Sequence, residues 1–218
     1  MKFTRTLIDY LPFSASQERV FWMNRGVWPA KWIGSAQKDV FANAYCCKVP
    51  LENSERIRLH VAADAIYKLY LDGELVGDGP EQGDLQHTYF DSYDWEADAG
   101  VHTLVAVVAS FDENGPLSRI QFRHGWLLAA ESHGEILDSN AGNWRLLPLP
   151  GLSWRKSVSY AVTAYIGMDS VIDAMGFPKG FEQGEGEGWT VPVEYDCGAL
   201  SAMLNECKPQ PQLIPAEL

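Results

Sequence analysis

Residues 66–77 read Ile66-Tyr67-Lys68-Leu69-Tyr70-Leu71-Asp72-Gly73-Glu74-Leu75-Val76-Gly77, and this segment is the strongest indication of the fold. Apolar residues recur at alternate positions in its first half, which is the pattern of a half-buried strand. Asp72-Gly73 then supplies a pair of residues that readily takes the positive φ angles of a tight turn, and a second extended segment follows. The stretch therefore predicts a β-hairpin whose turn lies at residues 72–73.

Further strands are predicted on both sides of this hairpin. In Arg56–Val61 every second residue is apolar, so His60 shares an outward face with Arg56 and Arg58 and is expected to be solvated. The run His102–Ser110 is apolar at almost every position, which is typical of a central strand covered on both faces. The remaining predicted strands include residues 44–50, 125–131, 143–147 and 160–166. Together these segments predict an all-β domain.

Composition and charge restrict the partners that such a domain can have. The chain has 218 residues, enough to bury a full core, and 46% of them are hydrophobic. Its 29 acidic and 17 basic residues give a net charge of -12, which repels nucleic acid and anionic membrane surfaces, so we expect neither as a partner. Eight Trp, nine Tyr and nine Phe provide core volume first and, second, flat platforms for a neutral carbohydrate.

The four cysteines show neither a disulfide framework nor a zinc site. Cys46 and Cys47 are neighbours on a predicted strand and point to opposite faces, and Cys197 and Cys207 lie far downstream without a matching CxxC pair. We expect reduced thiols. The first nine residues lack the unbroken apolar run of a signal peptide, which favours a cytoplasmic protein, or a periplasmic or secreted one if a leader has been removed.

Changes in hydrophobic periodicity and proline content along the chain predict three parts. Residues 1–27 show no sustained period and are interpreted as an arm that lies on the body. Residues 28–207 form the β-sandwich domain, and the proline-spaced residues 208–218 are typical of a linker-like tail. Short helical turns are expected at residues 16–23 and 168–175.

Several segments share their order and spacing with one known group of enzymes. These segments are Trp32-Ile33-Gly34, Ile57–Ala63, Ile66–Gly73 with Val76-Gly77, Tyr89–Asp94, Gly100–Leu104, Leu137-Asp138 with Trp144, and Gly188-Trp189. Between residue 28 and about residue 215, the chain resembles the N-terminal β-sandwich region of bacterial α-L-rhamnosidases of glycoside hydrolase family 78.

This resemblance implies a jelly-roll β-sandwich of the galactose-binding type, with short helical turns and an N-terminal arm, placed ahead of an (α/α)6 barrel that carries the hydrolytic carboxylates. No long helical periodicity occurs in the 218 residues, so the barrel and its catalytic acid and base are absent from this chain. The implied role is accessory and non-catalytic. Such a module binds carbohydrate, with a rhamnose-containing glycan as one candidate, or packs against a catalytic barrel in the same or another chain.

The loop that follows the hairpin is the candidate carbohydrate site. Asp78, Asp84 and His87 are polar partners for sugar hydroxyls, and Tyr89 and Trp126 could stack against a sugar ring. The alternative is that the two aspartates cap turns and both aromatics belong to the core. In that case the chain is a purely structural interaction module without a sugar site.

The same loop contains the candidate ligands for a metal ion. Ca²⁺ prefers carboxylate and carbonyl oxygens, and Asp78, Glu81 and Asp84 could supply them together with nearby backbone carbonyls. No EF-hand-like spacing supports this interpretation.

A weaker alternative is a glycoside hydrolase that uses the acidic segment 182–194. Its carboxylates are Glu182, Glu185, Glu187 and Glu194. Glycoside hydrolysis needs two carboxyl groups held ~5 to 9.5 Å apart. The first three of these glutamates lie in a glycine-rich stretch without apolar shelter, which favours a solvated acidic loop. Neither this segment nor a Gly-x-Ser-x-Gly elbow provides a complete catalytic set, so no catalytic residue is predicted.

Overall fold

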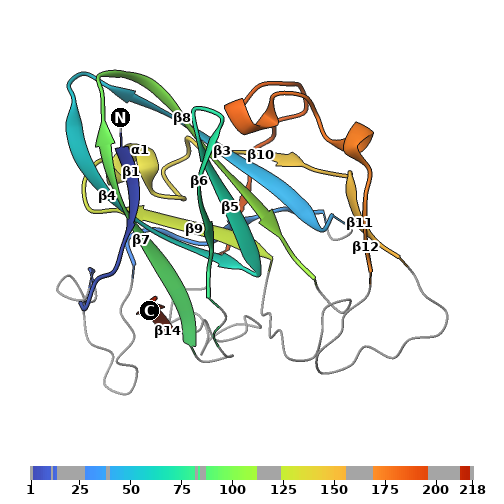
Figure 1. Cartoon of the computed structure of the whole chain (residues 1–218), viewed down its shortest axis with the longest axis horizontal. Coiled ribbons are helices and arrows are strands. Elements are labelled where there is room, and N and C mark those ends of the chain that lie inside the picture. The colour runs from blue at the N-terminus through green and yellow to red at the C-terminus, as the bar shows by residue number, and fades with distance from the viewer. Residues whose placement is uncertain are drawn as a thin grey trace.

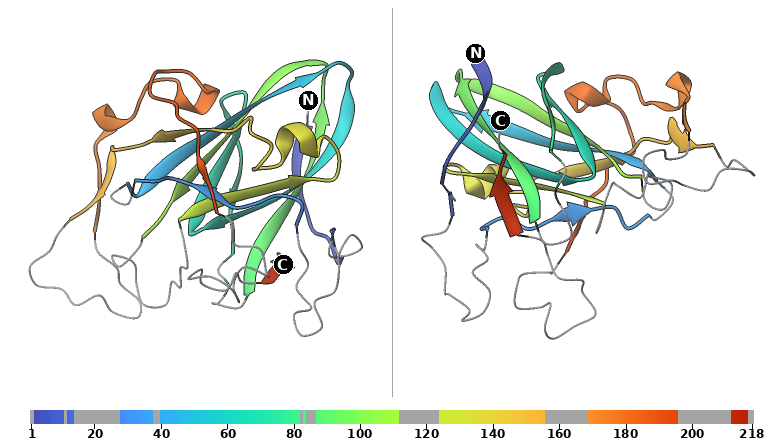
Figure 2. Two further views of the ribbon diagram at one scale, coloured as in Figure 1. Left: turned by 180° about the vertical axis from the view of Figure 1, so that it is seen from behind. Right: turned by 60° about the horizontal axis from the view of Figure 1, so that its bottom comes forward.

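Two β-sheets face each other and enclose the core (Figures 1 and 2). The computed structural model describes residues 2–10, 12–13, 28–37, 40–81, 83, 87–111, 124–155, 169–195 and 212–216, with the backbone alone at 87 and 212–215. The expected helical turn at 16–23 and the expected strand at 160–166 lie outside these residues.

The first sheet has seven strands in the order β1-β7-β4-β9-β2-β13, with β14 also paired to β7. These strands are β1 (Lys2–Thr6), β7 (His87–Ala97), β4 (Glu55–Asp64), β9 (Gly125–Ala130), β2 (Ile33–Gly34), β13 (Val193–Glu194) and β14 (Gln212–Pro215). All pairs are antiparallel except β14 with β7, which is parallel.

The second sheet has five antiparallel strands in the order β10-β3-β8-β5-β6. These are β10 (Arg145–Pro148), β3 (Ala42–Leu51), β8 (Gly100–Ala109), β5 (Ile66–Leu71) and β6 (Glu74–Gly79). Strands β2 to β9 are arranged as β2-β9-β4-β7 in one sheet and β3-β8-β5-β6 in the other, which is the strand order of a jelly roll. The predicted all-β jelly-roll sandwich is confirmed.

The predicted hairpin is the β5–β6 pair. Asp72 and Gly73 both have positive φ angles, of 52° and 86°, as the tight turn requires. The Asp72 carboxylate accepts hydrogen bonds from the Thr103 backbone N–H at 2.7 Å and from the His102 ring at 2.8 Å. These bonds attach the turn to β8. β8 is the central strand of this sheet, as the continuous apolar run of residues 102–110 predicted.

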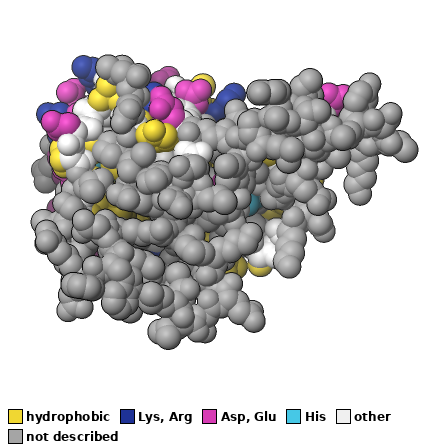
Figure 3. Space-filling model, turned by 90° about the horizontal axis from the view of Figure 1, so that it is seen from below, with side chains coloured by type: hydrophobic (Ala, Val, Ile, Leu, Met, Phe, Trp, Pro, Cys, Tyr) yellow, Lys and Arg dark blue, Asp and Glu magenta, His cyan; other side chains and the backbone are white. Residues whose placement is uncertain are grey.

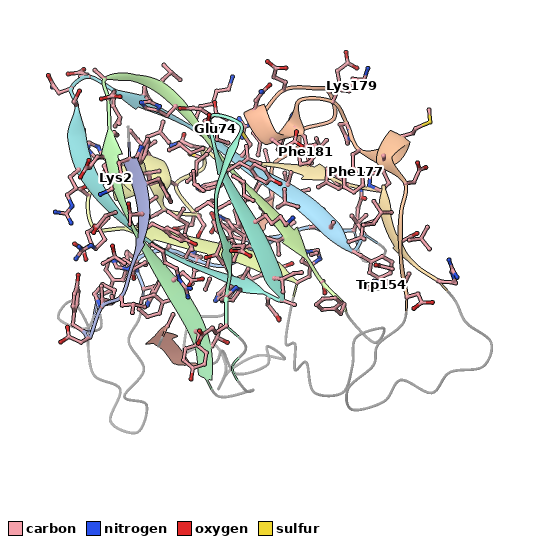
Figure 4. The ribbon with its side chains drawn as sticks, viewed as in Figure 1. Lys2, Glu74, Trp154, Phe177, Lys179 and Phe181 are labelled. Atoms are coloured by element: carbon pink, nitrogen blue, oxygen red, sulfur yellow. The ribbon has the colours of Figure 1, made fainter. Side chains whose placement is uncertain are left out.

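A smaller unit covers the outer face of the five-stranded sheet. It contains the two-stranded sheet of β11 (Leu152–Trp154) and β12 (Ser170–Ile172) and the 3-10 turns η3 (Ala174–Gly176) and η4 (Phe181–Gln183). Figure 4 shows Phe177 and Phe181 lying beside the five-stranded sheet, and Phe181 is buried against Ala44 and Cys46 of that sheet.

The prediction of a helix at residues 168–175 is wrong for the part of it that the structure describes, residues 169–175. The β-branched Val171 and Ile172 pair with β11 as a strand, and only a 3-10 turn follows, capped by the Asp173 carboxylate, which accepts a hydrogen bond from the Met175 backbone N–H at 3.0 Å. The one α-helix among the described residues is instead α1 (Gly134–Leu137).

Cys46 and Cys47 are buried free thiols on β3 and point to opposite faces, as predicted. Cys47 lies between the two sheets, whereas Cys46 belongs to the cluster under the smaller unit. Burial raises the pKa of the Cys46 thiol to about 11 and that of the Cys47 thiol to about 12, which keeps both protonated at neutral pH. Cys197 and Cys207 lie outside the described residues.

Both ends of the described chain join the same strand. β1 pairs with Ser92–Glu96 of β7, and β14 pairs with His87–Phe90 of β7. The predicted N-terminal arm therefore begins with a strand of the sheet, β1. Part of the proline-spaced tail, β14, is extended alongside β7. The boundaries at residues 27 and 207 stay predictions. Within the described residues, no helix is long and apolar enough to cross a membrane.

Candidate functional site

The structure describes part of the predicted carbohydrate site. Asp78 is exposed at the end of β6, Glu81 is exposed beyond it, and Tyr89 is half-buried on β7. Asp84 and the side chain of His87 lie outside the described residues. For Asp78 and Tyr89, the predicted contact with a sugar stays a prediction.

Trp126 is a correction to the predicted site. The residue lies on β9 with its indole fully buried between the two sheets, and its ring packs edge-on against Tyr67 and Trp144, with centroids 5.5 and 6.2 Å away. A buried ring offers no face to a sugar, so its assignment as a stacking platform is wrong. β9 is buried at all six positions, and a strand covered on both faces leaves none of its side chains at the surface.

A buried polar cluster lies beside β6, close to the start of the predicted loop. Asp91 is fully buried and accepts hydrogen bonds from the Arg5 guanidinium and the Tyr67 hydroxyl, both at 2.5 Å, and the Tyr67 and Tyr93 hydroxyls are 2.9 Å apart. A Cβ added at Gly79 would clash with the Asp91 carboxylate, so the β6 backbone closes over it. The cluster ties β1, β5 and β7 together.

The electrostatics of Asp91 point to a structural role. Desolvation raises the pKa of its carboxyl, while the hydrogen bond from Tyr67 and the charge of Arg5 oppose that rise. Burial also raises the pKa of Tyr67 well above its ordinary value. Because the Asp91 carboxylate on β7 binds Arg5 of β1 and Tyr67 of β5, it helps to hold β1 in the sheet.

A polar depression of about 330 Å³ lies on the other, outer face of the seven-stranded sheet. The side chains that line it are Arg56, Arg58, Asp94, Glu131 and Ser132. This site was not predicted. The signal available in the sequence was the alternation that places Arg56 and Arg58 on one face of a strand, but their carboxylate partner on β7 could not be identified without the strand register.

Asp94 organises one side of this depression. Its carboxylate accepts two hydrogen bonds from Arg58, at 2.8 and 3.1 Å, one from Arg56 at 2.8 Å and one from the Thr6 hydroxyl at 2.9 Å. These hydrogen bonds lower the pKa of Asp94 far below its ordinary value, and the hydrogen bonding from Arg58 has the largest effect. The carboxylate therefore stays ionised, and both guanidinium groups are held in place.

Glu131 lines the other side and is hydrogen-bonded to Tyr10. The Arg58 guanidinium donates to the Tyr10 hydroxyl at 2.9 Å, and that hydroxyl donates to Glu131 Oε1 at 2.8 Å. The same Glu131 oxygen lies 3.2 Å from His60 Nε2. A continuous chain of hydrogen bonds thus crosses the depression and runs into the protein interior.

His60 was expected to be solvated, and that prediction is wrong. Its side chain is fully buried, with the rings of Phe13, Trp28 and Phe90 packed edge-on around it at centroid distances of 5.5 to 6.1 Å. His60 does lie on the same face of β4 as Arg56 and Arg58, as expected, but Phe13 and Trp28 cover that face at its position.

The hydrogen bonds of His60 define its protonation state. Desolvation has the largest effect on the His60 ring and lowers its pKa to about 4, so the ring is neutral at pH 7. Glu131 can only accept, so Nε2 carries the proton and donates to it, and Nδ1 accepts from the Ser92 hydroxyl at 2.9 Å. The buried ring therefore fixes the position of a carboxylate at the surface.

This burial predicts a pH-dependent stability. Because the folded-state pKa of His60, about 4, lies below the unfolded value of 6.5, the unfolded chain binds the proton first as the pH falls. The contribution of His60 to the free energy of unfolding is therefore complete above pH 6.5 and declines toward pH 4, by roughly 2 kcal/mol at pH 5. Urea denaturation between pH 7.5 and 5 measures it.

The control for this pH dependence is a His60→Gln variant, which cannot titrate in this range. Its free energy of unfolding should be lower at pH 7.5 and should decline less than that of the parent chain between pH 7.5 and 5. Equal declines in both proteins would show that His60 does not account for the loss.

The acidic segment offers no shelter for a pair of catalytic carboxyls. Glu185, Glu187 and Glu194 are exposed and Glu182 is half-buried, and Glu194 forms an ion pair with Lys31 at 3.2 Å. Within the part of the chain that the structure describes, no three His, Cys, Asp or Glu side chains are placed to hold a metal ion. The Ca²⁺ candidates Asp78 and Glu81 belong to that part, whereas Asp84 does not.

Comparisons with known proteins extend the fold assignment. No protein-family model matches the sequence, and no curated protein matches it. The structure is similar to a GH78 family rhamnosidase of Bacillus sp. GL1, with a TM-score of 0.67 and 24% sequence identity over 87% of this chain and 20% of that chain.

Two further solved structures show the same relation. An α-L-rhamnosidase from Dictyoglomus thermophilum matches 87% of this chain and 22% of its own, with a TM-score of 0.56 and 15% identity. One from Aspergillus terreus matches 79% and 22%, with a TM-score of 0.53 and 16% identity. The chain thus spans about a fifth of the length of these enzymes. It has the fold of a β-sandwich region of α-L-rhamnosidases of glycoside hydrolase family 78, as its sequence predicted.

Proposed function

We propose that this chain is an accessory, non-catalytic β-sandwich of an α-L-rhamnosidase-like glycoside hydrolase and that it binds carbohydrate. The observation that carries the proposal is the match of 87% of this chain to only 20% of a GH78 rhamnosidase. A region that small corresponds to one module of a larger enzyme. Modules of this kind hold a glycan near a catalytic domain, which in this case would be a barrel in the same or another chain.

The proposed sugar site is the loop after the β5–β6 hairpin. Exposed Asp78 offers a carboxylate to sugar hydroxyls, and Asp84 and His87 are further polar groups of the loop. With Trp126 buried, half-buried Tyr89 remains as the aromatic ring of this set that could stack on a sugar. A rhamnose-containing glycan is the ligand to test first, because the structural neighbours are named as rhamnosidases.

A second candidate function is domain packing without sugar binding. The burial of Trp126 favours it, because the largest ring of the predicted site belongs to the core. In that case the sandwich contributes a rigid surface on which a catalytic barrel docks.

Calorimetric titration with L-rhamnose and rhamnosyl oligosaccharides separates the two candidates. The binding function predicts measurable heat at millimolar ligand and stabilisation against heat, about 1.4 kcal/mol when the free ligand reaches ten times its dissociation constant. Tyr89→Ala should reduce the affinity roughly tenfold, in line with the loss of a stacking contact worth about 1.4 kcal/mol.

The matched control is Glu52→Gln, which changes an exposed carboxylate in the turn between β3 and β4 and should leave the titration unchanged. Absence of both heat and thermal stabilisation with the parent chain would rule out the binding function for these sugars and would leave domain packing.

A further inference from the structure

The depression on the outer face of the seven-stranded sheet is a preformed constellation of polar groups. Arg58 is held by Asp94 and by Tyr10, Asp94 also by Thr6, and Glu131 by Tyr10 and His60. Side chains fixed in this way lose little conformational entropy when a ligand binds, which favours binding. The depression's volume of about 330 Å³ lies at the lower end of the range for small-molecule sites.

Behind this surface lies a buried polar pair that packing alone does not require. His60 and Ser92 are both buried, and they form the chain Ser92–His60–Glu131 that ends at the floor of the depression. Burying polar groups costs free energy even when they are hydrogen-bonded, and an apolar side chain would fill the space between Phe13, Trp28 and Phe90. What the polar pair supplies is a fixed orientation for Glu131.

Unused hydrogen-bonding capacity remains on two of the lining residues, Arg56 and Glu131. The Arg56 side chain is 63% exposed, and among the described residues its guanidinium makes one hydrogen bond, from Nη2 to Asp94. Glu131 uses Oε1 for both of its partners, and its second oxygen has none within the described part of the chain. The depression therefore combines free N–H donors with a free carboxylate acceptor.

The charges of the lining residues select the class of ligand. Two guanidinium groups face two carboxylates, with Arg–Asp94 contacts of 2.8 to 3.1 Å. An anion would be repelled by Asp94 and Glu131, and a cation by Arg56 and Arg58. A neutral ligand with neighbouring hydroxyl groups satisfies both kinds of group, because one hydroxyl accepts from Arg56 while the next donates to Glu131. Figure 3, seen from below, shows acidic and basic side chains close together at one edge of the molecule.

We propose that this depression is a carbohydrate-binding site, in which Arg56 and Glu131 bind adjacent hydroxyl groups of a neutral sugar and Tyr10 borders the ring. The site goes beyond the proposed function, because it lies on the outer face of β4, β7 and β9 and not in the loop at residues 78–89. A shallow, open site of this kind suits one residue of a longer glycan.

Two-dimensional ¹H–¹⁵N NMR of the full chain tests the site directly. The probes are methyl α-L-rhamnoside and methyl β-D-galactoside, which both carry neighbouring hydroxyls on one face of the ring, and inorganic phosphate as an anion. We expect either sugar at millimolar concentration to shift the amide signals of Arg56, Arg58, Asp94, Glu131 and Ser132, and we expect phosphate to leave them unchanged.

Arg56→Ala and Glu131→Gln should each weaken the binding at least tenfold. Arg56 is exposed, so we expect its replacement to leave the fold intact, and this variant remains informative even if Glu131→Gln disturbs His60. The matched controls are Arg145→Ala on β10 and Glu74→Gln on β6, both exposed and both on the other sheet, and both should bind like the parent chain.

Each outcome separates this site from the loop. Shifts at the depression that are lost with Arg56→Ala support the inference, whether or not the loop signals also move. Shifts confined to residues 78–89 would overturn it while leaving the proposed function intact. Phosphate binding to the same amides more tightly than either sugar, or no shift there with either sugar, would also overturn it.

Discussion

Replacing Trp126 by alanine is expected to lower the free energy of unfolding by about 4 kcal/mol, because large-to-small changes of this kind remove a buried ring and leave a cavity. The indole is fully buried between the sheets and packs edge-on against Tyr67 and Trp144. Urea denaturation followed by circular dichroism measures the change. A loss this large is a substantial part of the stability of an ordinary domain, so the variant should be partly unfolded at physiological temperature.

Met175→Ala is the control for this prediction. Met175 is 95% exposed, and substitution at such a position should change the stability by no more than about 0.5 kcal/mol. If Trp126→Ala instead kept the parent stability and abolished sugar binding, the indole would have to be accessible, and its place in the core would be wrong.

Asp91→Ala is expected to cost about 3 kcal/mol, because it removes a fully buried carboxylate that accepts hydrogen bonds from the buried Tyr67 hydroxyl and from the partly exposed Arg5 guanidinium. Tyr67 would lose the acceptor for its buried hydroxyl, and Arg5 would lose the carboxylate that holds β1 to β7. The effect should be local as well as global. Hydrogen exchange should become faster first in Lys2–Thr6, where β1 is released.

The control for Asp91 is Glu52→Ala, which removes an exposed carboxylate and should leave both stability and exchange in β1 unchanged. A loss below about 1 kcal/mol for Asp91→Ala, a value typical of exposed ion pairs, would show that this cluster is solvated and does not fasten the strand.

The parts of the fold that the sequence predicted depend on local patterns. The turn at Asp72-Gly73 follows from the preference of these two residues for positive φ angles, and the central strand follows from the continuous apolar run after His102. The order of the matching segments then indicated a jelly roll, and the strand order confirms it.

The errors concern which part of a strand is covered. The alternation of apolar and polar residues shows that His60 and Arg58 share a face of the strand. It cannot show that Phe13 and Trp28 cover His60 and leave Arg58 partly exposed. The same limit applies to Trp126. A continuous apolar run indicates burial on both faces but does not show whether its terminal aromatic lies inside the sandwich or at its rim.

The polar depression was out of reach of the sequence for a related reason. Its lining residues come from β4, from β7 and from the segment directly after β9, and they meet only because the β4–β7 register places Arg58 opposite Asp94. That register is set by the packing of the whole sheet, so no short motif contains it.

The pairing of β14 with β7 has a consequence for the order of events during synthesis. Gln212–Pro215 lies alongside His87–Phe90, although more than half of the chain separates the two segments. The jelly-roll strands β2 to β9 leave the ribosome long before β14 does, so they can assemble while this side of β7 is still unpaired. Until residue 215 emerges, a nascent chain would expose backbone N–H and C=O groups there, where another nascent chain could pair with it.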